Sequence, residues 1–162
     1  MMKRTSVSLT DNLMLCFAYA TNLNKEKMSQ RCPKSRPLHL TRLMGHALRI
    51  ALPQKFPSGP GWATNAPEKG PFVPGLLYLL HEEDLSALDD YEDYPTLYVR
   101  REVNVESDQG WERAIIYQMT GPLRYTRPTA EYAQILRRGY RENNLPMAVL
   151  ESAMGTSLGT GT

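Results

Sequence analysis

The stretch FAYATNLNKEKMSQRCP, residues 17–33, joins an apolar run to a charged helical segment through small polar residues. The run over residues 13–19 is short and continuous, which is typical of a buried strand. Asn24 is placed to cap a helix over residues 25–32, which Pro33 ends. Backbone N–H groups at such a turn form a potential anion site, and small residues let a ligand approach them closely. An ordinary turn between a strand and a helix would have the same sequence pattern.

Downstream, the chain alternates between segments typical of strands and of helices. The sequence predicts strands within residues 38–52, 72–80, 97–105 and 111–119, and helices over 82–92, from Pro128 onward, and within 145–154. Residues 53–71 are rich in proline and glycine, so we expect a loop with at most a short strand near 62–65. Five residues of the helix after Pro128 follow the spacing of one buried face: Tyr132, Ile135, Leu136, Gly139 and Tyr140.

This order of elements predicts one α+β domain with a mostly β core of five or six strands and helices at the edges. A length of 162 residues allows a sizeable core, and 41% hydrophobic residues is ordinary for a globular protein. We expect the domain to cover residues 11–154. Residues 1–10 are expected to be a flexible N-terminus and residues 155–162 a disordered tail.

Charge is unevenly distributed, although the net charge is only +2. Residues 1–50 carry nine Lys and Arg, whereas residues 81–93 carry seven acids and no Lys or Arg. The two regions either form solvated faces of opposite sign or the basic half helps to attract an anionic small molecule. No continuous Lys and Arg stripe with interleaved aromatic residues is present, so we expect no nucleic-acid partner.

The two cysteines and the apolar runs argue against a metal site and a membrane segment. Cys16 and Cys32 show neither CxxC nor Cys/His spacing, so we expect two buried, reduced thiols and no metal site. No apolar run approaches the ~20 residues that a membrane helix needs. Residues 13–20 are too short for a signal sequence. The sequence therefore predicts a cytoplasmic protein that does not associate with a membrane.

One carboxylate of the acidic segment is expected to face inward. If residues 82–92 form a helix, Leu85 and Leu88 mark its apolar stripe, and Glu92 falls on that stripe. A carboxylate on a buried stripe is costly, and its pKa tends upward, which suits acid/base chemistry near neutral pH. Fraying of the helix end would instead turn Glu92 to water. The other acids at this end of the segment fall off the stripe and are expected in solvent: Asp89, Asp90 and Asp93.

These features together resemble the γ-glutamylcyclotransferase family. FAYATNLN, residues 17–24, looks like the FAYGSNLN-type loop of that family, and RCP at residues 31–33 matches its continuation. VPGLLYLLHEEDLSALDDYEDYPTLYVRREVNV, residues 73–105, resembles a second signature in which a strand leads to LxxLDxxE. Residues 128–132 and NNLP at 143–146 match the C-terminal helix, so the resemblance covers about residues 13–152.

The resemblance implies a small mixed β-barrel of about five to six strands with peripheral helices and a cavity at one end. The catalytic Glu of the family maps onto Glu92. Its loop after the first strand, which holds the glutamyl moiety, maps onto Tyr19, Ala20, Thr21, Asn22 and Leu23. The tyrosines that line its pocket map onto Tyr98 and Tyr132.

The reaction implied is intramolecular. The α-amine of a γ-glutamyl group attacks its own γ-carbonyl, which releases 5-oxoproline and a free amine or amino acid. The expected partner is therefore a small-molecule γ-glutamyl substrate, and no cofactor is expected. A non-catalytic small-molecule-binding domain on the same fold is the alternative. The sequence leaves open the leaving group and the oligomeric state, for which a homodimer is one option.

The loop departs from the family pattern, because Ala20-Thr21 stands where Gly-Ser is usual. If the family uses glycine for a positive φ, Ala20 would be strained there. Thr21 keeps the hydroxyl group but is stiffer at χ1. We therefore expect a loop that either accepts a differently shaped γ-glutamyl compound or binds such compounds poorly.

Overall fold

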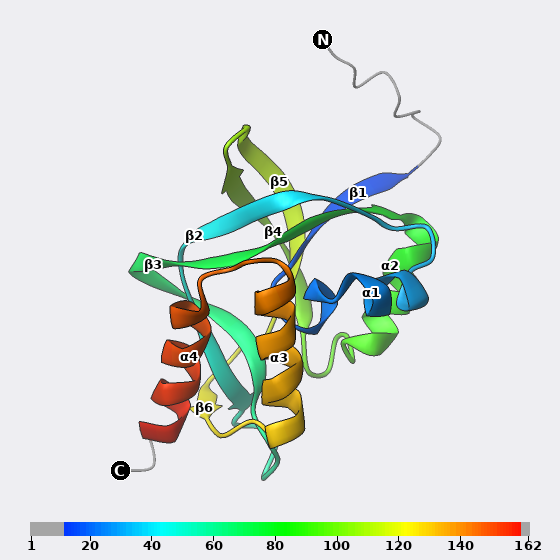
Figure 1. Cartoon of the computed structure of the whole chain (residues 1–162). Helices are drawn as coiled ribbons and strands as arrows, with labels where there is room; N and C mark the ends of the chain where they lie inside the picture. Colours follow the sequence, from blue (N-terminus) through cyan, green and yellow to red (C-terminus); the bar gives the residue numbers. More distant parts are fainter. Residues whose placement is uncertain (1–11, 160–162) are drawn as a thin grey trace.

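The computed structural model describes residues 12–159, in which a strand-rich core is flanked by helices (Figure 1). The strands are β1 (Leu13–Ala18), β2 (Arg36–Pro53), β3 (Trp62–His81), β4 (Val99–Ser107), β5 (Gly110–Gln118) and β6 (Leu123–Tyr125). The helices are α1 (Lys25–Arg31), α2 (Glu82–Tyr91), α3 (Ala130–Glu142) and α4 (Met147–Gly159), with a 3₁₀ turn, η2 (Thr21–Leu23), after β1.

The strands close into a barrel. Their order is β3-β1-β5-β4-β2-β6, and a further pairing between β3 and β2 joins the ends of the five-stranded part. β1 runs parallel to β5 at Cys16 and Ile115, whereas β1 pairs with β3, and β4 with β5, in antiparallel fashion. The predicted α+β fold with a small mixed β-barrel and peripheral helices is therefore confirmed, with β6 added beside β2.

The long hairpin of β2 and β3 is the largest departure from the expected elements. The loop predicted over residues 53–71 is confirmed for residues 54–61 and wrong beyond them, because β3 already begins at Trp62, opposite Ala51, and remains paired to Pro67, opposite His46. Pro67 is tolerated here because the strand is exposed over residues 67–70 and the register shifts just before its partner His46. From residue 62 onward, the proline and glycine content therefore belongs to an irregular strand and not to a loop.

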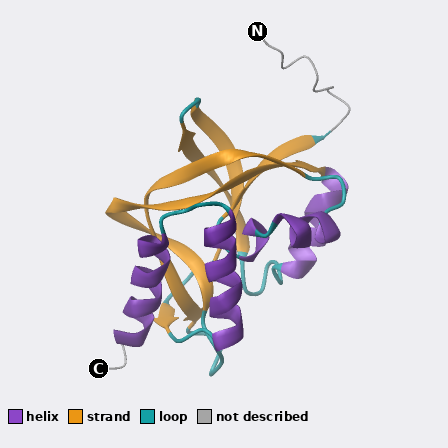
Figure 2. Cartoon of the chain, viewed as in Figure 1, coloured by secondary structure: helices purple, strands orange, loops and turns teal. Residues whose placement is uncertain are grey.

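The helices lie in two groups beside the barrel, as Figure 2 shows. α3 and α4 pack together, as do α1 and α2. α4 continues to Gly159, within the predicted tail, while residues 160–162 and the predicted flexible residues 1–10 lie outside the described residues. Within residues 12–159, no helix is both long and apolar enough to cross a membrane.

The core lies inside the barrel and under α3. Phe17, Leu77 and Ile116 from three strands are at most 1% exposed, and Leu136 of α3 is equally buried. Ile135 is a correction to the predicted buried face, because its side chain is 43% exposed. α3 thus buries a narrower stripe than its sequence pattern indicates.

Candidate functional site

A cavity of about 410 Å³ lies between the end of β1, the η2 turn, the end of α2 and the start of α3. Its inner wall is formed by buried residues such as Cys16 and Phe17 of β1. Tyr91 and Ile135, each 43% exposed, belong to its more open part. A largely apolar cavity of this size with a few polar groups is typical of a small-molecule site.

Glu92 lies at this cavity, directly after α2. Its backbone N–H donates to the carbonyl of Leu88 over 2.8 Å, so the chain still follows the last helical turn. The helix itself ends one residue earlier than predicted, at Tyr91, yet the stripe marked by Leu88 still predicts the inward side correctly. Oε2 of Glu92 accepts a hydrogen bond from Nδ2 of Asn22 over 3.3 Å.

The surroundings of Glu92 change its acidity. Burial raises the pKa of its carboxyl group from the ordinary 4.5 to about 7, and the nearby charge of Arg31 holds back a further rise. Near pH 7 the ionised and protonated forms are therefore both populated. Such a carboxyl group can accept a proton and return it within one reaction.

Three tyrosines with buried side chains line the cavity: Tyr19, Tyr98 and Tyr132. Burial raises the pKa of each hydroxyl group, so all three stay protonated and uncharged near neutral pH. The hydroxyl of Tyr98 donates to the carbonyl of Ala63 over 2.5 Å, while that of Tyr132 accepts from the N–H of Ala63 over 2.9 Å. Because Tyr132 is the acceptor there, its own proton can serve a ligand.

The loop between β1 and α1 forms another wall through Ala20, Thr21 and Asn22. Ala20 has a φ of −136°, so the strain expected for alanine at a positive φ does not arise. The hydroxyl of Thr21 shares a hydrogen bond of 2.9 Å with that of Tyr91. As the first residues of a 3₁₀ turn, Thr21 and Asn22 have backbone N–H groups without partners inside that turn.

Leu23, the last residue of the predicted binding loop, lies away from the cavity. Its side chain is fully buried, and its carbonyl accepts a hydrogen bond from Nδ2 of Asn143 over 2.9 Å. A Cβ atom at Gly139 of α3 would lie only 3.0 Å from the Cβ of Leu23. Leu23 therefore anchors the loop on α3, and the other predicted site residues are those that meet at the cavity.

Residues 16–141 match the family model described as "Gamma-glutamyl cyclotransferase, AIG2-like". The chain belongs to this family. It is similar to the γ-glutamylcyclotransferase of Bos taurus, with 32% identity over 82% of this chain and 73% of the relative. The Homo sapiens γ-glutamylcyclotransferase is 28% identical over 85% of this chain and 75% of its own length. These relatives are enzymes, and the chain is an enzyme of the γ-glutamylcyclotransferase family.

Solved structures agree with this assignment. A Homo sapiens protein titled "uncharacterized protein loc79017" superposes with a TM-score of 0.75 and 28% identity, covering 88% of this chain and 87% of its own. A structure titled "Gamma-glutamyl cyclotransferase" gives a TM-score of 0.74 at 28% identity, covering 87% of this chain and 86% of its own. YkqA from Bacillus subtilis, at 19% identity and a TM-score of 0.73, shares the fold over 91% of this chain and 55% of its own.

The sequence missed one acidic residue beside the site of this family member. Asp89 was expected in solvent, but its carboxylate accepts a hydrogen bond from the hydroxyl of Tyr117 over 2.7 Å. The same oxygen lies 3.0 Å from Nε of Arg100. Asp89 thus ties α2 to β4 and β5, one turn before Glu92. The sequence signal that could have placed Asp89 near the site is its spacing, three residues before Glu92.

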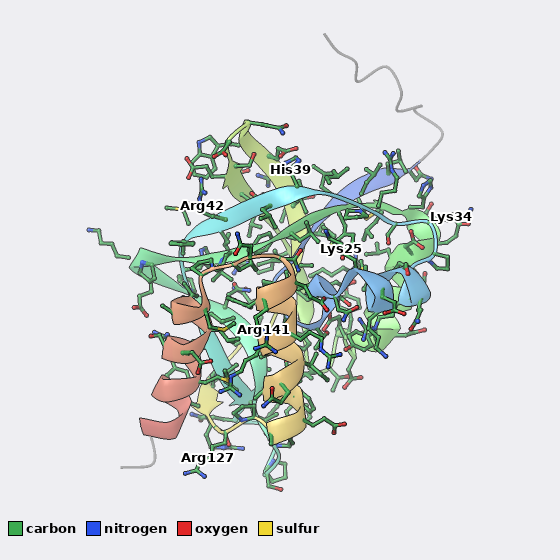
Figure 3. The ribbon with its side chains drawn as sticks, viewed as in Figure 1. Lys25, Lys34, His39, Arg42, Arg127 and Arg141 are labelled. Carbon is green, nitrogen blue, oxygen red and sulfur yellow. The ribbon has the colours of Figure 1, made fainter. Side chains whose placement is uncertain are left out.

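The basic residues lie elsewhere. The basic side chains labelled in Figure 3 are dispersed over α1, β2 and α3 and the segments next to them. Among the described residues, no Lys, Arg or His lines the cavity. The positive charge of the described N-terminal half therefore lies outside the walls of the cavity.

Proposed function

We propose that this chain cleaves γ-glutamyl amides by intramolecular attack of the substrate's α-amine, releasing 5-oxoproline and a free amine or amino acid. Membership of the γ-glutamylcyclotransferase family supports the reaction type. The observation that carries the proposal is the carboxyl group of Glu92, which lines a cavity of small-molecule size and has a pKa of about 7.

The proton balance of this reaction explains why one such carboxyl group suffices. The α-nitrogen of the substrate starts as an ammonium group with three protons and ends in the lactam ring with one. The leaving nitrogen starts as an amide with one proton and ends as an ammonium group with three. Two protons therefore move between the nitrogens, and Glu92 carries them one at a time as base and then acid.

The carbon–nitrogen bonds change in the same sequence. Once the carboxylate of Glu92 has taken a proton from the α-ammonium, the free amine attacks the γ-carbonyl carbon. A tetrahedral intermediate with a negative oxygen forms. Transfer of a proton from Glu92 to the leaving nitrogen then lets the γ-amide bond break, and Glu92 moves the second proton from the ring nitrogen to the departing amine. A pKa near 7 matches both halves of this cycle better than the ordinary value of 4.5 does.

The remaining walls supply donors and orientation. We assign the α-carboxylate and the developing oxyanion to the backbone N–H groups of Thr21 and Asn22 and the hydroxyl proton of Tyr132, because all three residues line the cavity. Donors held on a fixed framework are effective because they need no reorganisation as charge develops. An enclosed cavity also holds the glutamyl chain folded, which ring closure requires.

The proposal is tested by measuring 5-oxoproline released from a panel of γ-glutamyl dipeptides and γ-glutamylamines. We expect at least one substrate to give equal amounts of 5-oxoproline and free amine. The same compound with an acetylated α-amine is the matched control and should be inert, because its nitrogen cannot attack. Release of glutamate in place of 5-oxoproline would contradict the intramolecular route. Calorimetric binding of a γ-glutamyl compound without any turnover would favour the non-catalytic binding domain.

A further inference from the structure

A single side-chain amide connects a cation to the proposed catalytic carboxylate. Nη1 of Arg31, the last residue of α1, donates to Oδ1 of Asn22 over 2.5 Å. Nδ2 of Asn22 donates to Oε2 of Glu92 over 3.3 Å. An amide has one accepting and one donating end, so the bond from Arg31 determines which end faces Glu92.

Arg31 is itself held in place next to α2. Its guanidinium carbon lies 3.7 Å from the ring centroid of Tyr91, the residue before Glu92. The hydroxyl of Tyr91 shares its hydrogen bond with Thr21, the neighbour of Asn22. Arg31 therefore contacts both segments that carry the linked pair, although it does not line the cavity.

Asn22, the residue between Arg31 and Glu92, is also held in place. The backbone carbonyl of Asn22 accepts a hydrogen bond from the buried hydroxyl of Tyr78 over 2.9 Å. Asn22 itself is only 7% exposed. With its backbone held by β3, the amide of Asn22 is a short, well-supported bridge between Arg31 and Glu92.

Among the charged and titratable groups around Glu92, Arg31 differs from the others in its effect on the Glu92 pKa. The other titratable groups around Glu92 come from several segments: Cys16 of β1 and Tyr19 just after it, Tyr117 of β5, Tyr98 just before β4, Glu131 and Tyr132 of α3, and Asp89 and Tyr91 of α2, the helix that Glu92 follows. Burial raises the pKa of Cys16, Tyr19, Tyr98, Tyr117 and Tyr132, so these groups are neutral near pH 7. Within the described part of the chain, Arg31 is the cation that acts on the pKa of Glu92, and it lowers it.

We propose that Arg31 is a positioning residue that orients the amide of Asn22 and, through it, holds the carboxylate of Glu92 for proton transfer. Its positive charge also favours the ionised carboxylate, the form that accepts the first proton. The kinetic part of this inference rests on the proposed cyclotransferase function. The effect of Arg31 on the protonation of Glu92 does not rest on that function, and it can be measured without turnover.

The test compares two substitutions with a matched control. Arg31→Gln removes the charge but keeps a donor, and Arg31→Lys keeps the charge. Lys27→Gln removes an exposed charge from the same helix. In the pH profile of kcat/KM, we expect the midpoint of the acid limb to lie near pH 7 in the parent. In Arg31→Gln this midpoint should move to higher pH by about 0.5–1 pH unit. The limb should return toward the parent position in Arg31→Lys and stay unchanged in Lys27→Gln.

This pattern differs from a general loss of structure or of substrate contact. At pH 6.5 the kcat/KM of Arg31→Gln should be about 3–10-fold below the parent, and the gap should narrow above pH 8. The same fold-loss at every pH would overturn the inference. So would a rise in KM with an unmoved limb, because it would place Arg31 on the substrate instead.

A titration of the ligand-free protein separates this inference from the proposed function. The carboxyl carbon of Glu92, labelled with ¹³C and assigned through Glu92→Gln, is followed by NMR as pH changes. An upward displacement of its midpoint in Arg31→Gln supports the inference even if no 5-oxoproline is formed. An unchanged midpoint overturns it, whether or not the enzyme turns over. A normal thermal unfolding curve for each variant is required before either result is interpreted.

Discussion

Asn22 and Glu92 lie 70 residues apart in the sequence, yet the amide of one donates to the carboxylate of the other. This contact joins the loop after β1 to the end of α2 beside the cavity. Both residues line the same cavity, so the group proposed to bind substrate and the group proposed to transfer protons form one unit. The proposed chemistry therefore depends on how the fold positions two segments that are far apart in the sequence.

The raised pKa of Glu92 predicts a pH-dependent stability difference. Because the folded pKa of about 7 exceeds the ordinary 4.5, the folded protein binds more protons than the unfolded chain between these values. The free energy of unfolding of the parent should therefore fall as pH rises from 4.5 to 7 and level off above. Glu92→Gln lacks this loss. The difference between its free energy of unfolding and that of the parent should therefore shift in favour of Glu92→Gln by about 2–3 kcal/mol across that range. Urea unfolding at several pH values measures it, and a constant difference would contradict the raised pKa.

The placement of Glu92 shows what the sequence could predict. The spacing from Leu88 located its inward side even though α2 ends at Tyr91, because the backbone keeps a helical hydrogen bond at Glu92. The same spacing failed for Asp89, which bonds to Tyr117 of β5. A helix pattern reports the direction of a side chain but not which distant strand approaches it.

Long-range pairing explains the other misses. The hairpin strand after Trp62 contains prolines that read as a loop, and only its pairing with β2 shows that the strand accommodates them, Pro67 at an exposed position. Ile135 follows the apolar spacing of α3 but lines the cavity, where its side chain is 43% exposed. Arg31 was noted only as part of a motif, because its contact with Asn22 depends on how the loop folds back.

The shared hydrogen bond of Thr21 and Tyr91 predicts coupled substitutions. Thr21→Val and Tyr91→Phe each remove one partner while keeping size and, in Tyr91, the ring that contacts Arg31. Each single change should lower the free energy of unfolding by about 0.5–1 kcal/mol, and the double variant should be no less stable than the worse single one. Denaturant unfolding of the four proteins measures the coupling. Fully additive losses would show that the bond contributes nothing.

From the position of Ile135 in the cavity, we predict that the enzyme prefers γ-glutamyl substrates with a large apolar leaving group. Its side chain is 43% exposed and lines the cavity, so replacing it should not disturb the core. Ile135→Ser should raise KM by about 3–10-fold for γ-glutamyl compounds with a large apolar leaving group, since that contact would be lost. A small leaving group should be affected less than twofold, by the same reasoning.

Gln134→Ser is the control for this prediction, because Gln134 is exposed on the same helix and does not line the cavity. It should leave both KM values unchanged. An equal change for large and small leaving groups in Ile135→Ser would show that Ile135 does not contact the leaving group.

The most direct test of the central claim is the rate of 5-oxoproline release by Glu92→Gln. The amide keeps the shape of the side chain but cannot accept the proton of the α-ammonium, so turnover should fall by about 10²–10⁴. Asp90→Asn is the matched control, because Asp90 is an exposed acid on the same segment that does not line the cavity, and its turnover should match the parent. Equal turnover in Glu92→Gln and the parent, with both proteins folded, would remove Glu92 from the mechanism and contradict the account.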